Sequence, residues 1–167
     1  MPDTNKGKLF EEEVYSKLII SKDWINLTPY DPNGEKDKTK PQYIHREFCS
    51  QFKKRFKFDP LKVWSKKINP DFVFYHPQLN KVIILEAKCQ TDKGSVDEKL
   101  QTSAYKKKQL AKLFFAALQT PLENVSYSYC LKKADFDKPE YKDTFEDIHD
   151  NGNEYYFVDE DFSFEIK

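Results

Sequence analysis

Three charged residues have the types and spacing to hydrolyse a phosphodiester with the help of a metal ion. Asp71 follows Pro70, and Glu86, Ala87 and Lys88 are consecutive. Hard divalent cations prefer carboxylate and carbonyl oxygens, so Asp71, Glu86 and the backbone carbonyl of Ala87 are candidate ligands of Mg²⁺. The amine of Lys88 could orient or help to deprotonate an attacking water and stabilise charge on the phosphate. The alternative is a set of ordinary charged residues on the wet face of a hairpin.

Two predicted strands would position these residues. Residues 70–75 and 82–90 are rich in β-branched and aromatic side chains and are separated by a loop with a proline, which predicts a β-hairpin. Side chains alternate across a strand, so Glu86, Lys88 and Gln90 share one face. The opposite face carries the apolar residues Phe72, Phe74, Ile83, Leu85 and Ala87. We therefore expect one face of the hairpin to be core and the other to be polar.

The hairpin register decides whether the two carboxylates meet. If the turn is the four residues PQLN, His76 pairs with Lys81. Counting back along both strands then brings Asp71 opposite Glu86. Two carboxylates in this arrangement repel each other unless a cation lies between them. The register therefore favours a metal site.

Upstream of the hairpin, two helices and a loop are predicted. Apolar residues recur at every fourth position from Phe10 to Leu18, which predicts a helix to about Ile20. Residues 28–42 contain three prolines and a glycine and predict an exposed loop. A second apolar stripe predicts a basic amphipathic helix over residues 43–56. Its apolar positions are Ile44, Phe48, Phe52 and Phe56.

Downstream of the hairpin, a capped helix and two strands are predicted. Ser95 and Glu98 match an S-x-x-E capping box, in which the serine hydroxyl caps the start of a helix and the glutamate reaches back to the capping residue. This helix should continue to about Leu118. Alternating side chains predict strands over residues 125–131 and 155–158, with a short helix between them.

The composition predicts one soluble domain. A chain of 167 residues has room for a single core, and no stretch approaches the roughly 20 apolar residues that cross a bilayer. The polar start of the sequence is unlike a secretory signal. Three cysteines lack the spacing of a zinc or redox motif, so we expect reduced thiols and a cytoplasmic location. A zinc site shared by His45 and Cys49 would need further ligands that we do not find in the sequence.

The charges are unevenly distributed along the chain, although the formal net charge is zero. Residues 36–67 hold eleven Lys or Arg against three acids, and residues 99–112 add five lysines and no acid. Residues 135–167 hold twelve acids against three lysines. The two basic segments flank the candidate site and could contact a phosphate backbone. The alternative is two solvated lysine-rich faces.

The Pro-Asp pair at Asp71 and the sequence Glu86-Ala87-Lys88 resemble the motif of the PD-(D/E)xK nuclease superfamily. The resemblance implies an α/β fold with a restriction-endonuclease-like core, ordered helix, three strands, helix, strand, in which a mixed central sheet is flanked by helices. Residues 61–65 would supply the first strand. We expect a single nuclease domain over residues 1–167, with a basic helical and loop insert at about 28–60.

Two further site residues follow from the resemblance. Family members often begin with a helix of the form G-x-x-x-E whose glutamate approaches the metal, and Gly7 to Glu11 matches this spacing. The alternative for Glu11 is an acid favoured by the positive end of a helix. Gln90 extends the motif to ExKxQ, and together with GSVDEKL at residues 94–100 it is similar to small type II restriction endonucleases. The alternative for Gln90 is an ordinary polar residue at the end of a strand.

The resemblance also implies an activity. It implies a Mg²⁺-dependent endonuclease, in which Mn²⁺ should substitute, that hydrolyses double-stranded DNA as a type II restriction enzyme and a homodimer. A junction-resolving, repair or homing endonuclease of the same fold is the alternative within this class. A non-catalytic module that binds nucleic acid or protein is the alternative outside it, and the intact Asp71, Glu86 and Lys88 argue against such a module.

Overall fold

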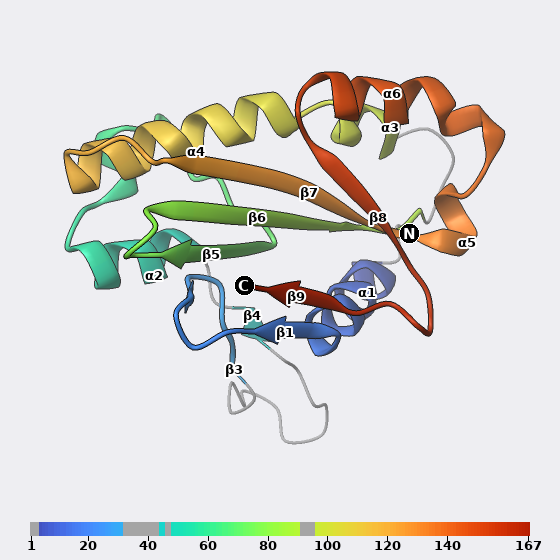
Figure 1. Cartoon of the computed structure of the whole chain (residues 1–167), viewed down its shortest axis with the longest axis horizontal. Coiled ribbons are helices and arrows are strands. Elements are labelled where there is room, and N and C mark those ends of the chain that lie inside the picture. Colours follow the sequence, from blue (N-terminus) through green and yellow to red (C-terminus); the bar gives the residue numbers. More distant parts are fainter. Residues whose placement is uncertain (1–3, 32–43, 46–47, 91–95) are drawn as a thin grey trace.

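The computed structural model describes residues 4–31, 44–45, 48–90 and 96–167, and its centre is a five-stranded sheet (Figure 1). In spatial order the strands are β2 (Ile25–Asn26), β5 (Phe72–His76), β6 (Lys81–Lys88), β7 (Asn124–Lys132) and β8 (Glu154–Val158). β5 is antiparallel to both β2 and β6, whereas β6, β7 and β8 are parallel. This mixed sheet, flanked by helices, confirms the predicted fold class.

Helices cover both faces of the sheet (Figure 1). They are α1 (Thr4–Ser16), α2 (Phe48–Phe56), α3 (Val96–Leu100), α4 (Ser103–Leu118), α5 (Lys133–Phe136) and α6 (Lys142–Asp150), with the 3₁₀ turns η1 (Pro60–Lys62) and η2 (Pro139–Tyr141). Side chains of α2, α4 and α6 pack in one core cluster, and side chains of α1 pack in a second cluster on the opposite face.

The hairpin of β5 and β6 has the predicted register. His76 pairs with Lys81, and the ladder continues without interruption to Phe72 on β5. One step beyond this last pair, Asp71 and Glu86 lie next to each other at the end of the hairpin. The turn length predicted from the sequence is therefore sufficient to align the two carboxylates.

Both faces of the hairpin are buried, so the prediction of one polar face is wrong. The face that carries Glu86 is apolar along most of its length and packs under α2 and α4. Its buried residues are Val73, Tyr75, Val82 and Ile84. A sheet covered by helices on both faces buries the side chains of both faces, so polar groups reach water near the strand ends. Asp71, Glu86 and Lys88 lie at such an end.

The first helix ends earlier than predicted. α1 stops at Ser16, and the next residues form the short strand β1 (Leu18–Ile20), which runs parallel to β9 (Phe164–Ile166). Two consecutive isoleucines favour a strand, and β9 supplies the hydrogen-bonding partner. The apolar side of α1, with Phe10 and Val14, packs on β6 as its spacing indicates.

The basic amphipathic helix begins later than predicted. Tyr30–Asp31 (β3) pair with Ile44–His45 (β4), so the helix starts at Phe48. Most of the predicted loop, residues 32–43, lies outside the described residues. Phe48 and Phe52 are fully buried, which makes α2 part of the main core.

The strand predicted over residues 61–65 is wrong. The segment opens with η1, whose start is capped because the Asp59 carboxylate accepts a hydrogen bond from the N–H of Leu61 at 3.1 Å. An aspartate directly before a proline favours a helical start. β2 instead supplies the first strand of the core, antiparallel to β5.

The long helix predicted to reach residue 118 is divided into α3 and α4. The hydroxyl of Thr102 donates to the carbonyl of Lys99, and the hydroxyl of Tyr129 donates to the carbonyl of Leu100, both at 2.9 Å. These bonds satisfy carbonyls at the end of α3, so the chain can start a new helix. The predicted cap, Ser95, lies outside the described residues.

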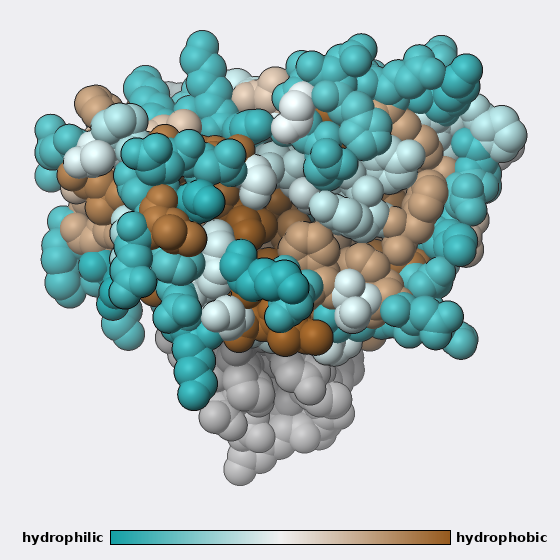
Figure 2. All heavy atoms as spheres, viewed as in Figure 1, coloured by the Kyte–Doolittle hydropathy of each residue, from teal (hydrophilic) through white to brown (hydrophobic). Residues whose placement is uncertain are grey.

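The remaining strands follow the prediction. Those expected over residues 125–131 and 155–158 are confirmed as β7 and β8. Figure 2 shows hydrophilic side chains along the upper edge of the molecule, where α4 and α6 lie, and apolar side chains in the middle of this face. Within the ranges given above, no helix has the length and apolar character needed to span a membrane.

Candidate active site

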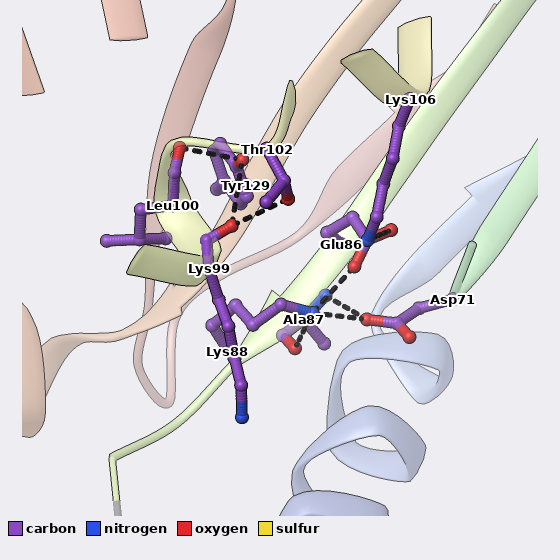
Figure 3. Close-up of polar contacts among 9 residues, drawn as sticks. All are labelled: Asp71, Glu86, Ala87, Lys88, Lys99, Leu100, Thr102, Lys106 and Tyr129. Atoms are coloured by element: carbon purple, nitrogen blue, oxygen red, sulfur yellow. Dashed lines mark hydrogen bonds and ion pairs between the residues drawn. The ribbon is translucent and has the colours of Figure 1, made fainter. Parts of the chain in front are cut away.

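Asp71, Glu86 and Lys88 meet at the end of the hairpin (Figure 3). The Nζ atom of Lys88 lies 3.0 Å from Oδ2 of Asp71 and 2.6 Å from Oε2 of Glu86. It also donates to the carbonyl of Ala87 at 3.1 Å. The N–H of Ala87 donates to the same Asp71 oxygen at 2.9 Å, which fixes that carboxylate against β6.

The three oxygens around the Lys88 ammonium are those predicted to bind a metal. They come from Asp71, Glu86 and the Ala87 carbonyl, and all lie within 3.1 Å of one positively charged atom. Such an all-oxygen donor set suits Mg²⁺ or Mn²⁺ rather than a metal that prefers thiolates. The described residues contain no cluster of three or more acidic, histidine or cysteine side chains that could bind a metal, so water or a phosphate would have to complete the coordination.

Burial and charge act in opposite directions on these groups. Burial alone would raise the pKa of Glu86, whose side chain is 1% exposed, but Lys88 and Lys106 hold that pKa below its usual value. Burial alone would lower the pKa of Lys88, but the charges of Asp71 and Glu86 raise it. At Asp71 burial outweighs the effect of Lys88, and the pKa is raised. At neutral pH, Glu86 and Lys88 are therefore both ionised.

Glu11 lies beside this group, on the helix that packs on β6. Burial raises the pKa of its carboxyl to about 7, and the negative charge of Asp71 is the next cause. The charges of Lys88 and Glu86 also act on this carboxyl. Within the described residues, no hydrogen bond or ion pair joins Glu11 to Asp71, Glu86 or Lys88, so its approach to the metal stays a prediction.

A second lysine, Lys106 of α4, belongs to the site and was not predicted there. Its Nζ atom lies 2.8 Å from Oε1 of Glu86, whereas Lys88 contacts Oε2. The only signal in the sequence is the acid-free run of lysines over residues 99–112, which predicts phosphate contacts. When Glu11, Asp71 and Glu86 are all ionised, three carboxylates face two ammonium groups and the centre carries one net negative charge.

Gln90 has other partners. Its side-chain carbonyl accepts a hydrogen bond from the hydroxyl of Tyr141 at 2.8 Å, and its N–H donates to Oδ2 of Asp135 at 2.9 Å. No hydrogen bond among the described residues joins Gln90 to the three central residues. The structure therefore places Gln90 where it connects the end of β6 to the C-terminal part of the chain.

A buried tyrosine lies on the same side of the sheet as Glu86. Tyr127 is 1% exposed, and within the described residues its hydroxyl has no hydrogen-bond partner. Burial and then the negative charge of Glu86 raise its pKa, so the phenol stays protonated. Its O–H therefore lies in the field of the Glu86 carboxylate.

The two basic segments lie at different distances from this centre. The segment in α4 borders it through Lys106. The basic helix α2 does not, because Phe56 packs on Tyr75 near the hairpin turn, at the other end of β6 from Glu86. There an open hollow of about 440 Å³ is lined by three cations, Lys54, Arg55 and Lys57, and by no acid. Among the described residues of the two segments, those of α4 border the site and those of α2 do not, whereas residues 36–43 and 46–47 of the first segment lie outside the described ranges.

Comparison with known families yields a match over more than half of the chain. The family model described as the PD-(D/E)XK nuclease superfamily domain matches residues 4–112. This range includes α1, the hairpin and the part of α4 that carries Lys106. No curated protein and no solved structure matches the chain.

Proposed function

The chain belongs to the PD-(D/E)XK nuclease superfamily, and from this premise we propose that it is a metal-dependent endonuclease that hydrolyses phosphodiester bonds of double-stranded DNA. Mg²⁺ is the proposed cofactor, with Mn²⁺ as a substitute. The catalytic residues are Asp71, Glu86 and Lys88, with Glu11 beside them and Gln90 as a candidate for DNA contact.

The observation that carries this proposal is the convergence of three oxygens on the Lys88 ammonium. Two carboxylates and a carbonyl lie within 3.1 Å of its nitrogen. The sequence motif alone predicts that these groups and this amine form one reaction centre. A non-catalytic module would have no need to place two carboxylates and a lysine together at a partly buried strand end, where separating charges from water is costly.

Each residue has a role that follows from its contacts. Asp71, Glu86 and the Ala87 carbonyl would hold the cation. When bound, a divalent cation supplies positive charge to a phosphate oxygen and favours deprotonation of the attacking water. Lys88 would then leave the oxygens that it contacts in the structure and turn its ammonium toward the phosphate, where it stabilises developing negative charge. Lys106 keeps Glu86 ionised while this exchange takes place.

The DNA substrate is supported by two cationic surfaces. α4 borders the site through Lys106, and the three cations beside α2 lie at the other end of β6. A duplex that spans both would place one phosphate at the site and others over α2, because phosphate contacts position a protein on DNA without regard to sequence.

A more specific form of the proposal is a type II restriction endonuclease that acts as a homodimer in the cytoplasm, built as one domain with a basic insert at about 28–60. Its support is the family resemblance of Gln90 and the segment after it. Cleavage of a plasmid at one fixed sequence would favour restriction, whereas selective cleavage of a four-way junction would favour a resolving enzyme.

The test is a plasmid assay with purified protein in Mg²⁺ or EDTA. The wild type should nick or linearise the plasmid in Mg²⁺ only, and Glu86→Ala and Lys88→Ala should not. Lys142→Ala, an exposed lysine of α6 outside both cationic surfaces, is the matched control and should cut like the wild type. Equal nicking by the wild type and both site variants would reject the proposed mechanism.

A further inference from the structure

Lys106 stands where its own helix disfavours a cation. α4 begins at Ser103, so Lys106 lies in the first turn, and this turn contains no acid. The N-terminus of a helix carries partial positive charge and favours acids. The contact with Glu86, whose side chain is 1% exposed, compensates for this unfavourable position. The placement therefore indicates a role that depends on Glu86.

Buried hydrogen bonds hold this end of α4 in place. The side-chain N–H of Asn153 donates to the hydroxyl oxygen of Ser103 at 2.9 Å, and both residues are buried. Tyr129, which lies opposite Glu86 in the ladder of β6 and β7, donates to the last carbonyl of α3. As Figure 3 shows, Lys106 descends from α4 toward Glu86 while Tyr129 holds the preceding turn. The start of α4 is thus anchored on both β7 and the C-terminal part of the chain.

Lys88 and Lys106 each contact a different oxygen of the Glu86 carboxylate. Lys106 contacts Oε1, and Oε2 faces the point that Asp71 and the Ala87 carbonyl also face. A cation that replaces the Lys88 ammonium at this point meets one oxygen of Glu86 for as long as Lys106 holds the other.

The number of oxygens that a carboxylate offers distinguishes one divalent cation from another. Mg²⁺ is small, requires nearly ideal octahedral geometry and takes one oxygen from a carboxylate. Ca²⁺ is larger, accepts six to eight ligands and often binds both oxygens of a carboxylate. We propose that Lys106 is a positioning residue that restricts Glu86 to one oxygen and thereby makes the site select Mg²⁺ over Ca²⁺. This inference rests on the proposed function, because it requires a cation at the hairpin end.

The test measures binding of each metal alone, without DNA. Isothermal titration calorimetry gives the Kd of Mg²⁺ and of Ca²⁺ for the full chain as wild type, Lys106→Met, Lys106→Arg and Lys108→Met. Loss of the positive charge should tighten binding of both ions, so the ratio of the two Kd values is the readout. We expect Lys106→Met to shift this ratio about tenfold toward Ca²⁺, the size of effect found when a group that orients a metal ligand is removed. Lys106→Arg and Lys108→Met should keep the wild-type ratio.

The outcomes separate this inference from the proposed function. A Lys106→Met ratio equal to that of the wild type, with both ions bound, would overturn the inference and leave the metal site intact. A wild type that binds neither ion would overturn both. Circular dichroism verifies that Lys106→Met is folded, and Lys106→Ala, which also lacks a donor to Glu86, replaces it in the same comparison if it is not.

Discussion

Oε2 of Glu86 and Nζ of Lys88 are 2.6 Å apart, and that Nζ atom lies where the oxygens proposed to bind the metal converge. A divalent cation and this ammonium cannot occupy the same point. Under the proposed function, Lys88 would therefore compete with the metal in the free protein and act as a catalytic group once the metal is bound. Removal of the amine should therefore have opposite effects on metal binding and on cleavage.

Lys88→Met should separate metal binding from cleavage. Without the competing ammonium, we expect Mg²⁺ to bind more tightly, by about tenfold, whereas cleavage should fall by about a hundredfold or more because the charge on the phosphate is no longer stabilised. Calorimetry and plasmid cleavage measure the two effects. Weaker Mg²⁺ binding in this variant would show that Lys88 assists the metal instead of competing with it.

Asp71 and Glu86 should differ in their effect on stability, although we expect both to be needed for activity. Glu86→Gln leaves two lysines facing a neutral amide, which we expect to lower the free energy of unfolding by about 2 kcal/mol. Asp71→Asn removes a charge that burial disfavours, since the pKa of Asp71 is raised, and should not destabilise the protein. Urea unfolding in EDTA compares them. Greater destabilisation by Asp71→Asn would contradict the charge assignment.

Glu11 should make the metal-free protein less stable as the pH rises. Its carboxyl has a pKa of 4.5 when unperturbed and about 7 in the folded protein, so the folded state binds more protons between these values. Stability therefore falls as the pH rises from about 4.5 to about 7, by on the order of 2 kcal/mol from this group. Glu11→Gln should lack this part of the decline and be more stable than the wild type at pH 8.

Denaturant titrations at several pH values in EDTA measure this effect of Glu11. Glu13→Gln changes an exposed acid of the same helix and serves as the control. Its stability should depend on pH in the same way as that of the wild type. Parallel curves for the wild type and Glu11→Gln would contradict the prediction.

The cations beside α2 should contribute to DNA affinity but not to chemistry. Replacing Lys54, Arg55 and Lys57 by glutamine should weaken binding at low salt and reduce the slope of log K against log salt by about 0.9 for each phosphate that is no longer neutralised. The cleavage rate at saturating DNA should stay unchanged. Lys142→Gln, an exposed lysine in the acidic segment, is the control. An unchanged salt dependence would exclude α2 from the DNA interface.

The hairpin and its register could be predicted because they depend on local information. A turn of four residues and the alternation of side chains are enough to align Asp71 with Glu86. The burial of both faces was also visible in principle, because the run from Val82 to Leu85 is continuously apolar and does not alternate.

Other features could not be predicted from the sequence because they depend on distant segments. β1 exists because β9 pairs with it, and the break between α3 and α4 depends on the hydroxyl of Tyr129. Lys106 is one of three consecutive lysines, and only the packing of α4 on the sheet decides which of them reaches Glu86. Local periodicity predicts a helix but not its rotation over a strand.

The parallel pairing of β1 with β9 has a consequence for how the protein is made. Ile166 packs in the same cluster as Phe10 and Val14 of the helix that carries Glu11. On the ribosome the first helix emerges long before β9, so it cannot gain its packing against Ile166 until β9 has also emerged. The part of the candidate site that α1 carries is therefore fixed in place only after nearly the whole of this sequence has been translated.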